Sequence, residues 1–289
     1  MYRAAKSPST RTMGIEMSKK NFNFRRVDSD KSFSLPDIPT APPAEPKKSH
    51  LESVKREISE LSERLNKLQL RLHASNERGV LLVLQGMDTS GKDGAIRHVF
   101  SHVSPLGVRA EPFGAPSADE RRHDYLWRVH AKAPRRGELV VFNRSHYEDV
   151  LVTRVRGWIN KTTCKQRYQH IQAFERMLSD EGIAIIKCYL HISKQEQKQR
   201  LQARMDDPDK HWKLQASDFE DRRLWKDFIK AYEDAMIATS TDYAPWYVIP
   251  ADSKIYRDYF LMTLLVETLE GLKIKPPAAS FDLKSARLD

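Results

Sequence analysis

The feature that most constrains this chain is a buried strand that runs directly into a glycine-spaced loop. Residues 80–94 read VLLVLQGMDTSGKDG. In a phosphate-binding P-loop, glycines let backbone N–H groups turn toward phosphate oxygens, a lysine adds positive charge, and the following helix presents its N-terminus. We therefore place Gly91, Lys92 and Asp93 at a phosphate site. The alternative is an ordinary glycine-rich turn, but the strand before the glycines and the helix predicted after them favour the P-loop.

Two residues depart from the usual P-loop pattern. Asp93 stands where Ser or Thr normally offers a hydroxyl to magnesium, and Asp88 lies inside the loop. A carboxylate 4 Å from a phosphate oxygen costs about 4 kcal/mol at intermediate dielectric. A cation between them removes this repulsion, and Mg²⁺ prefers a few carboxylates together with substrate phosphates. Asp88 is therefore the predicted metal ligand, and Asp93 either a second carboxylate near the metal or a cap of the helix.

Composition limits the class of protein. The chain has 289 residues, is 40% hydrophobic and carries a formal charge of +10, which suits one large α/β domain with an anionic partner. Cys164 and Cys188 lack the spacing of a zinc site or a disulfide framework. No apolar run is long enough to span a bilayer, and the N-terminus lacks a secretory apolar core. We expect a soluble, cytoplasmic protein with no membrane partner.

Three segments are expected along the chain. Residues 1–50 are rich in Ser, Lys, Arg and Pro and predict a disordered or loosely attached tail. Residues 51–272 form a single domain that opens with a helix over 51–74, and 273–289 are a C-terminal tail. Apolar residues three and four apart form one stripe along that first helix. The stripe serves either self-association or packing on its own domain.

Strand and helix patterns alternate after residue 78. We predict strands at 79–84, 108–113, 138–142, 183–192 and 246–249, and helices near 92–103, 117–132, 163–181, 194–205, 217–239 and 254–270. This order indicates an α/β, P-loop kinase-like fold. We expect a mostly parallel sheet flanked by helices on both faces, with ligands at the carboxyl ends of the strands.

A dense polar cluster follows the third of these strands. Asn143 stands where many P-loop enzymes have a magnesium-binding aspartate, so metal contact falls to Glu148 or Asp149, or passes through water from Asn143. Arg144 is suited to bind a phosphoryl group and neutralise developing charge. An ion pair between Arg144 and Glu148 is the alternative. We expect His146 to be structural, because a phosphate nucleophile is already anionic and needs no general base.

Basic residues predict a cover for a polyanion. Arg200 and Arg204 lie four apart and share a helix face, and a Pro-broken basic loop follows them. A mobile cationic flap of this kind excludes water during phosphoryl transfer. A solvated charge run is an equally weighted alternative. Arg128 belongs to another basic segment, which either lines a channel for a long anion or is an exposed helix face.

Four motifs together resemble the polyphosphate kinase 2 family. They are GMDTSGKDG at 86–94, FNRSHYEDV at 142–150, DDPDKHWK at 206–213 and APWYVIPAD at 244–252. The similarity runs from about residue 51 to 272, and the second motif is similar to the branch that phosphorylates nucleoside mono- and diphosphates. The resemblance implies reversible transfer of a terminal phosphoryl group from inorganic polyphosphate to AMP or ADP, with guanine nucleotides as further acceptors. It also implies Mg²⁺, with Mn²⁺ as an alternative, and a helical lid over about 200–216.

The same resemblance assigns roles by position. It implies a catalytic set made of the metal-binding Asp88, the phosphate-binding Lys92, the strand-end Arg144, the lid residue Arg204, and Glu148. Asn143 or Glu148 is then the candidate second metal ligand. The loop and the basic segments described above add further predicted contacts to polyphosphate, which are Gly91, Asp93, Arg128, Arg200, Lys210 and Lys213.

Two other classes of protein share some of these features. An ATP-dependent nucleotide or small-molecule kinase would share the P-loop and differ in its phosphoryl donor. A nucleic-acid-binding P-loop protein would explain the positive charge, but no helix-turn-helix, aromatic RNA-binding set or zinc motif supports it. We expect no nucleic-acid partner, and a homo-oligomer that is a dimer or a tetramer.

Overall fold

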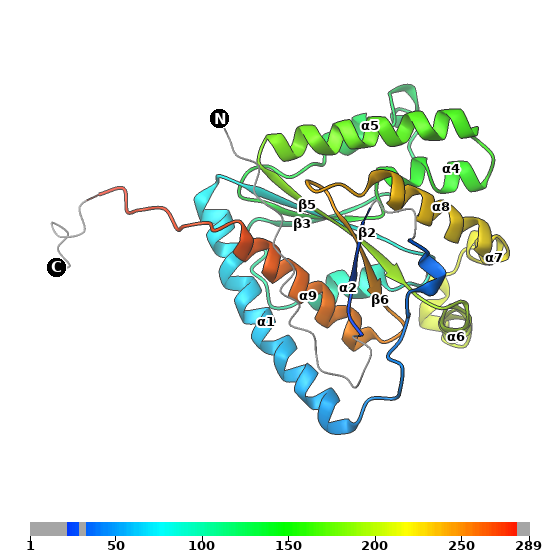
Figure 1. The fold of residues 1–289 in the computed structure, drawn as a ribbon, viewed down its shortest axis with the longest axis horizontal. Helices are drawn as coiled ribbons and strands as arrows, with labels where there is room; N and C mark the ends of the chain where they lie inside the picture. The colour runs from blue at the N-terminus through cyan, green and yellow to red at the C-terminus, as the bar shows by residue number, and fades with distance from the viewer. Residues whose placement is uncertain (1–21, 29–32, 282–289) are drawn as a thin grey trace.

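The computed structural model describes residues 22–28 and 33–281, which contain one six-stranded sheet (Figure 1). The strand order is β1-β6-β5-β2-β4-β3, and only the β1–β6 pair is antiparallel. The strands are β1 (Arg25–Val27), β2 (Gly79–Gln85), β3 (Val108–Pro112), β4 (Leu139–Asn143), β5 (Ile183–His191) and β6 (Trp246–Pro250). This confirms the predicted α/β class with its mostly parallel sheet.

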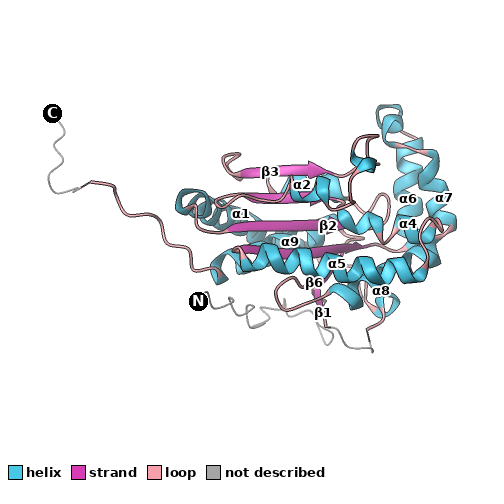
Figure 2. Ribbon diagram, turned by 90° about the horizontal axis from the view of Figure 1, so that it is seen from above, coloured by secondary structure: helices cyan, strands magenta, loops and turns pink. Residues whose placement is uncertain are grey.

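Helices cover both faces of the sheet. The α-helices are α1 (Lys48–Ser75), α2 (Lys92–Val99), α3 (Trp127–His130), α4 (Val152–Val155), α5 (Lys161–Asp180), α6 (Lys194–Met205), α7 (Ala216–Arg223), α8 (Trp225–Thr239) and α9 (Lys254–Gly271). One apolar core lies under α5 and α8, and a second lies under α1, α2 and α9. Figure 2 shows α6 and α7 beyond the arrowheads of the strands. The predicted helical lid segment therefore stands at the carboxyl edge of the sheet.

Strand β2 supplies the centre of both cores. Leu81 and Val83 belong to the core on one face, whereas Val80, Leu82 and Leu84 belong to the other. This alternation explains the unbroken apolar run in the sequence, because a central parallel strand buries both of its faces. Its register brings the end of β2 level with the end of β4, since Leu84 pairs with Asn143.

The apolar stripe of α1 packs on its own domain. Leu61, Leu65 and Leu72 are buried in the same core as helix α9, and Arg64 pairs with Glu270 of α9 at 2.7 Å. Figure 1 shows α1 and α9 side by side. Intramolecular packing thus accounts for the stripe, and the expected homo-oligomer stays a prediction.

The expectation of a disordered or loosely attached arm over 1–50 is wrong for residues 22–28 and 33–47. Strand β1 pairs with the otherwise open edge of β6, with Val27 opposite Trp246. Leu35 is fully buried, and its N–H donates to Glu233 on α8 at 2.9 Å. A few isolated apolar residues attach the arm to the domain. The mean composition of fifty mostly polar residues does not reveal them. The remainder of that predicted tail, 1–21 and 29–32, lies outside the described residues.

Two predicted helices are interrupted. Over 117–132 only a 3-10 turn at Glu120–Arg122 and the short α3 form. The Asp124 carboxylate accepts hydrogen bonds from the N–H groups of Leu126 and Trp127. These bonds start a new turn at Asp124, so the helix does not continue from the residues before it. The helix predicted at 217–239 divides at Leu224 into α7 and α8. None of the helices in the described ranges is both long and apolar enough to cross a membrane.

Replacing Leu35 with alanine tests the attachment of the arm. Because Leu35 is 0% exposed, we expect Leu35→Ala to lower the free energy of unfolding by about 3 kcal/mol, measured by urea denaturation. Leu106→Ala is the control, because Leu106 is 62% exposed and should change stability little. Equal stability of the two variants would show that the arm is not held in solution.

Candidate active site

The loop after β2 bends at three residues with left-handed or related backbone angles. Gly86 has φ 155°, Thr89 φ 63° and Gly91 φ 97°. A Cβ on Gly86 would lie 2.7 Å from Oγ of Ser90 and 2.9 Å from the carbonyl oxygen of Leu190, so only glycine allows this close turn. The chain then enters α2 at Lys92.

Backbone N–H groups line the start of α2. Within the described part of the chain, the N–H groups of Gly91, Lys92, Asp93 and Gly94 donate to no acceptor. Unpaired amides and the positive end of the helix dipole together attract anions. The predicted P-loop is therefore present, with its donors free.

Lys92 folds back onto the loop that it follows. Its Nζ donates to the carbonyl oxygens of Gly86 at 2.7 Å and Met87 at 3.3 Å. Burial and then the positive charge of Arg144 lower the pKa of Lys92 to about 8, while the negative charge of Asp88 opposes the shift. The lysine lies in the loop where a bound phosphate would meet it.

Arg144 crosses from β4 to the loop. Its backbone is left-handed, with φ 63°, and its N–H donates to the carbonyl of Leu84 at 3.0 Å. Its Nη2 donates to Oδ1 of Asp88 at 2.9 Å, and 43% of the side chain is exposed. Arg144 thus forms its ion pair with Asp88, and the alternative of an ion pair with Glu148 is not seen. Its side chain reaches solvent.

Acidic side chains gather beside this ion pair. A cavity of about 20 Å³, room for about one water, is lined by Asp88, Arg144, Glu148 and Asp221, together with Gly86, Met87, Val152, Phe228 and Tyr232. Burial raises the pKa of Glu148, and burial followed by the charge of Asp88 raises that of Asp221 to about 6.

Asp221 and its helix neighbour Asp218 were not predicted as site residues. Both lie on α7, three residues apart, and the pKa of Asp218 is raised by burial and then by Asp88. Their spacing puts them on one helix face, which is the only sequence signal they leave. Arg156 pairs with Asp221 and partly balances it.

The oxygen donors suit a hard divalent cation. Asp88 and Glu148 both face the small cavity, and carboxylate oxygens are the ligands that Mg²⁺ prefers. The amide nitrogen of Asn143 donates to Asp93 at 2.7 Å, and the Asp149 carboxylate lies 3.8 Å from Arg167. Asp149 does not line the small cavity, so Glu148 is the candidate second ligand. Among the described residues, no three His, Cys, Asp or Glu side chains form a complete metal site.

The structure contradicts the phosphate-binding prediction for Arg200. All five of its N–H donors already have acceptors, which are Oε1 of Glu196 and the carbonyl oxygens of Thr89, Ser90, Ala251 and Asp252, at 2.7 to 3.0 Å. Arg200 binds the carbonyl groups of the loop and has no donor left for a phosphate. Sequence spacing placed it beside Arg204 but did not show which way either side chain reaches.

The other predicted basic contacts lie at the edge of the site or beyond it. Arg204 donates to the carbonyl of Lys213 at 3.3 Å, and its charge lowers the pKa of Asp218 against the larger effect of burial. Lys210 pairs with Asp207 at 2.5 Å, and Lys213 lies over the Trp212 ring. Among the described residues, no hydrogen bond or ion pair joins Arg204, Lys210 or Lys213 to the loop.

Arg128 is also separate from the loop. It is buried and donates to the carbonyl of Gly114 at 3.1 Å, with Glu120 3.4 Å away. Its guanidinium lies over the Phe113 ring, 5.5 Å from the centroid. The structure brings together Asp88, Lys92, Arg144 and Glu148, and leaves Arg128 apart from them.

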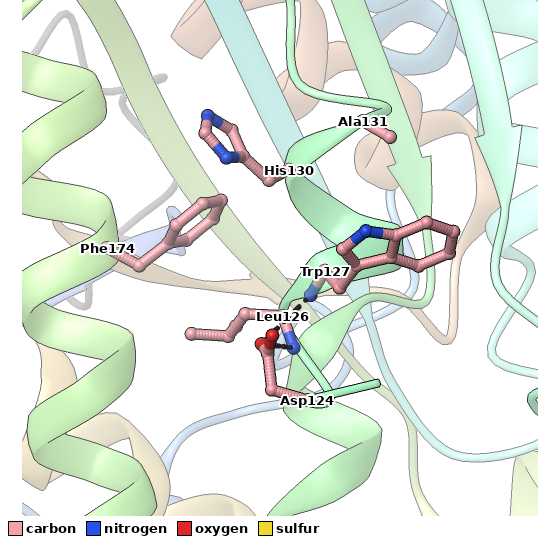
Figure 3. A pocket seen from close by; sticks show the side chains of 6 residues that line it. All are labelled: Asp124, Leu126, Trp127, His130, Ala131 and Phe174. Carbon is pink, nitrogen blue, oxygen red and sulfur yellow. Dashed lines mark hydrogen bonds between the residues drawn. The ribbon is translucent and has the colours of Figure 1, made fainter. Parts of the chain in front are cut away.

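A larger hollow of about 460 Å³ lies between α3 and α5. Figure 3 shows Phe174 of α5 on one side and Trp127 and His130 of α3 on the other, with Asp124, Leu126 and Ala131 completing the lining. None of the predicted site residues lines it. The smaller cavity is the candidate site, because unpaired backbone N–H groups and titratable side chains converge there.

A buried polar network supports the segment that carries Arg144 and Glu148. Lys187 on β5 donates to Glu175 on α5 at 2.5 Å and to the hydroxyl of Tyr147 at 3.0 Å. His146 lies 3.4 Å from Glu175, as its expected structural role requires. Paired buried charges hold one arrangement, because breaking the pair leaves an uncompensated charge.

Comparison with known proteins gives consistent matches. The sequence profile of the family described as "Polyphosphate kinase 2 (PPK2)" matches residues 48–277. The chain is 56% identical over 220 residues to the AMP/ADP-polyphosphate phosphotransferase of Meiothermus ruber, covering 76% of this chain and 82% of the relative. It is 43% identical over 227 residues to the ADP-polyphosphate phosphotransferase of Rhodopseudomonas palustris, covering 74% and 78%.

A solved structure extends the similarity to the whole fold. The crystal structure of polyphosphate kinase 2 from Arthrobacter aurescens TC1 superposes with a TM-score of 0.85 at 37% identity. The match covers 98% of this chain and 96% of the other.

Replacing Gly91 with alanine tests the loop geometry. A Cβ there would overlap Nη1 of Arg257, and the backbone has φ 97°. We expect Gly91→Ala to weaken the binding of inorganic tripolyphosphate at least tenfold, measured by calorimetry, because about 1–3 kcal/mol of local strain displaces the amides. Gly157→Ala is the matched control, since Gly157 has φ 72° and open space around it. Equal effects of the two changes would rule out a special role for the glycine of the loop.

The pKa of Lys92 predicts a pH dependence of phosphate binding. The lysine is cationic below about pH 8 and loses its charge above it, so the binding constant should fall as pH rises through 8. We expect about a tenfold larger Kd for tripolyphosphate at pH 9 than at pH 7. Lys92→Arg is the control, because arginine stays charged over this pH range while tripolyphosphate ionises in the same way with both proteins. The same pH ratio in both proteins would contradict the assignment.

Proposed function

Because this chain belongs to the polyphosphate kinase 2 family, we propose that it transfers a terminal phosphoryl group from inorganic polyphosphate to AMP and ADP. The observation that carries the proposal is the convergence of free loop amides, Lys92 and Arg144 at the end of β2. Relatives with names for this reaction share more than two fifths of their aligned residues with the chain. In principle the transfer is reversible.

The arrangement suits phosphoryl transfer because that reaction needs alignment and charge neutralisation more than covalent help from the protein. The loop amides and Lys92 hold phosphate oxygens, while Arg144 releases Asp88 and neutralises charge on the group in transfer. Asp88 and Glu148 would hold a divalent cation, Mg²⁺ or Mn²⁺, which supplies further charge neutralisation.

The surplus of positive charge fits a polymeric donor. A chain of phosphates carries about one charge per unit, as a nucleic-acid backbone does, and is held by cations beyond the reacting group. Arg204, Lys210 and Lys213 stand at the end of α6 and in the segment between α6 and α7, where closure of that segment would bring them toward such a chain. We infer that this segment is the lid, and that its closure excludes water.

The decisive experiment varies donor and acceptor separately. Purified protein with Mg²⁺ is given long-chain polyphosphate and either AMP, ADP or a guanine nucleotide, and products are separated chromatographically. A parallel reaction replaces polyphosphate with ATP and uses a non-adenine acceptor. We expect ADP and ATP to form only with polyphosphate. Transfer from ATP alone would instead identify an ATP-dependent kinase and discard the polymer donor.

Arg144→Ala serves as the site variant in the same assay. Loss of its charge should reduce kcat/KM by about a hundredfold or more, because the interaction acts on charge developing in the transition state. Circular dichroism checks that the fold is retained, and Arg97→Ala, at an exposed position on α2, is the arginine control. Near-normal turnover in Arg144→Ala would remove Arg144 from the site.

A further inference from the structure

The carbonyl groups of the phosphate loop are held by side chains from other parts of the site. Every carbonyl from Gly86 to Gly91 accepts a hydrogen bond from a side chain. Lys92 bonds those of Gly86 and Met87, Gln197 that of Asp88, Arg200 those of Thr89 and Ser90, and Arg257 that of Gly91. Since each trans peptide carries its N–H opposite its C=O, the bonds from Gln197, Arg200 and Arg257 to the carbonyls of residues 88–91 turn the N–H groups that follow to the other side.

Arg257 is the least expected member of this set. It comes from α9, more than 160 residues after the loop, and only 1% of it is exposed. Its Nη1 donates to the carbonyl of Gly91 at 3.2 Å, next to the helix bond from Ala95 to the same oxygen at 2.8 Å. Thus two donors fix the peptide that joins Gly91 to Lys92.

The glycines of the loop make room for this guanidinium. A Cβ on Gly91 would overlap Nη1 of Arg257, and one on Gly94 would touch it at 3.6 Å. Two glycines of the GKDG sequence therefore border Arg257 on its loop side. A side chain at Gly91 would push the arginine away from the amides that it orients.

The charge of Arg257 is unfavourable for the free protein and favourable for an anion. A cation buried behind the N-terminus of α2 adds to the positive end of the helix dipole. Its carboxylate partner, Asp258, is shared, because Oδ1 lies 2.6 Å from Nη2 of Arg257 while Oδ2 lies 3.0 Å from Nδ1 of His98. Arg200, which pairs with Glu196 at 2.7 Å, is a further cation beside it.

We propose that Arg257 is a positioning residue of the phosphate site, which orients the Gly91–Lys92 peptide and adds buried positive charge behind the loop. The proposal rests on the proposed function for the nature of the anion. Arg257 touches neither donor nor acceptor and acts through the loop amides. A purely structural arginine would affect stability without a specific effect on anion affinity.

The test compares anion affinity and stability in the full-length protein. Wild type, Arg257→Met, Arg257→Lys and Arg154→Met are titrated with inorganic tripolyphosphate by calorimetry, and their melting temperatures are measured. Arg154 is the matched control, because it is a partly buried arginine paired with Asp234 at 2.6 Å on another face.

We expect about a tenfold larger Kd for Arg257→Met, since a charge-assisted bond and a nearby charge are both lost. Arg257→Lys keeps the charge and should recover part of the affinity. Arg154→Met should lower the melting temperature and leave Kd unchanged. With polyphosphate as the varied substrate, the loss should appear in KM more than in kcat.

A Kd of Arg257→Met within twofold of wild type would overturn the proposal, as would an equal loss in Arg154→Met. Should Arg257→Met fail to fold, Arg257→Lys carries the test: a weaker Kd at a near-normal melting temperature supports the proposal, and an unchanged Kd overturns it. Binding is measured without turnover, so wild-type protein that binds tripolyphosphate yet transfers no phosphoryl group would sink the proposed function and leave this inference standing.

Discussion

The structure depends on one requirement, that the peptide groups between β2 and α2 turn their N–H groups to one side. A loop left to itself would pair its amides with its own carbonyls or with water. Here β2 is buried on both faces and holds the start of the loop, while side chains from α6 and α9 bind its carbonyls. The amides are thereby fixed before any ligand arrives. Such preorganisation matters because donors that need no rearrangement stabilise charge more effectively.

A second constraint is the balance of charge around the loop. Lys92, Arg144 and Arg257 concentrate positive charge, and Asp88, Glu148 and Asp221 oppose it within a small space. Arg144 and Asp88 pair with each other at 2.9 Å. A phosphate chain and a divalent cation would replace that pairing with stronger partners for both. The buried pair of Lys187 and Glu175 holds the segment that follows β4.

Much of this organisation follows from local sequence patterns. The apolar runs predicted five strands within about two residues, because a strand buried on both faces needs continuous apolar residues. The site prediction places Asp88, Lys92, Arg144 and Glu148 together, as the structure does, since parallel strands end at one edge of the sheet, and the roles of these residues stay predictions. It was wrong for Arg200, because helix spacing shows which residues share a face but not what that face meets. Asp221 was missed because α7 reaches the loop only through tertiary packing.

The phosphate loop, the class of fold and the family could be predicted from the sequence, because glycine spacing, strand periodicity and motif identity are local properties of the chain. Three features became visible only in the folded chain: the arm at 22–28 and 33–47 packs onto the domain, α1 covers α9, and Arg200 and Arg257 bind the carbonyl groups of the loop. These contacts join residues more than a hundred positions apart. Whether they form depends on which surfaces the folded chain brings together, and a local sequence pattern does not contain that information.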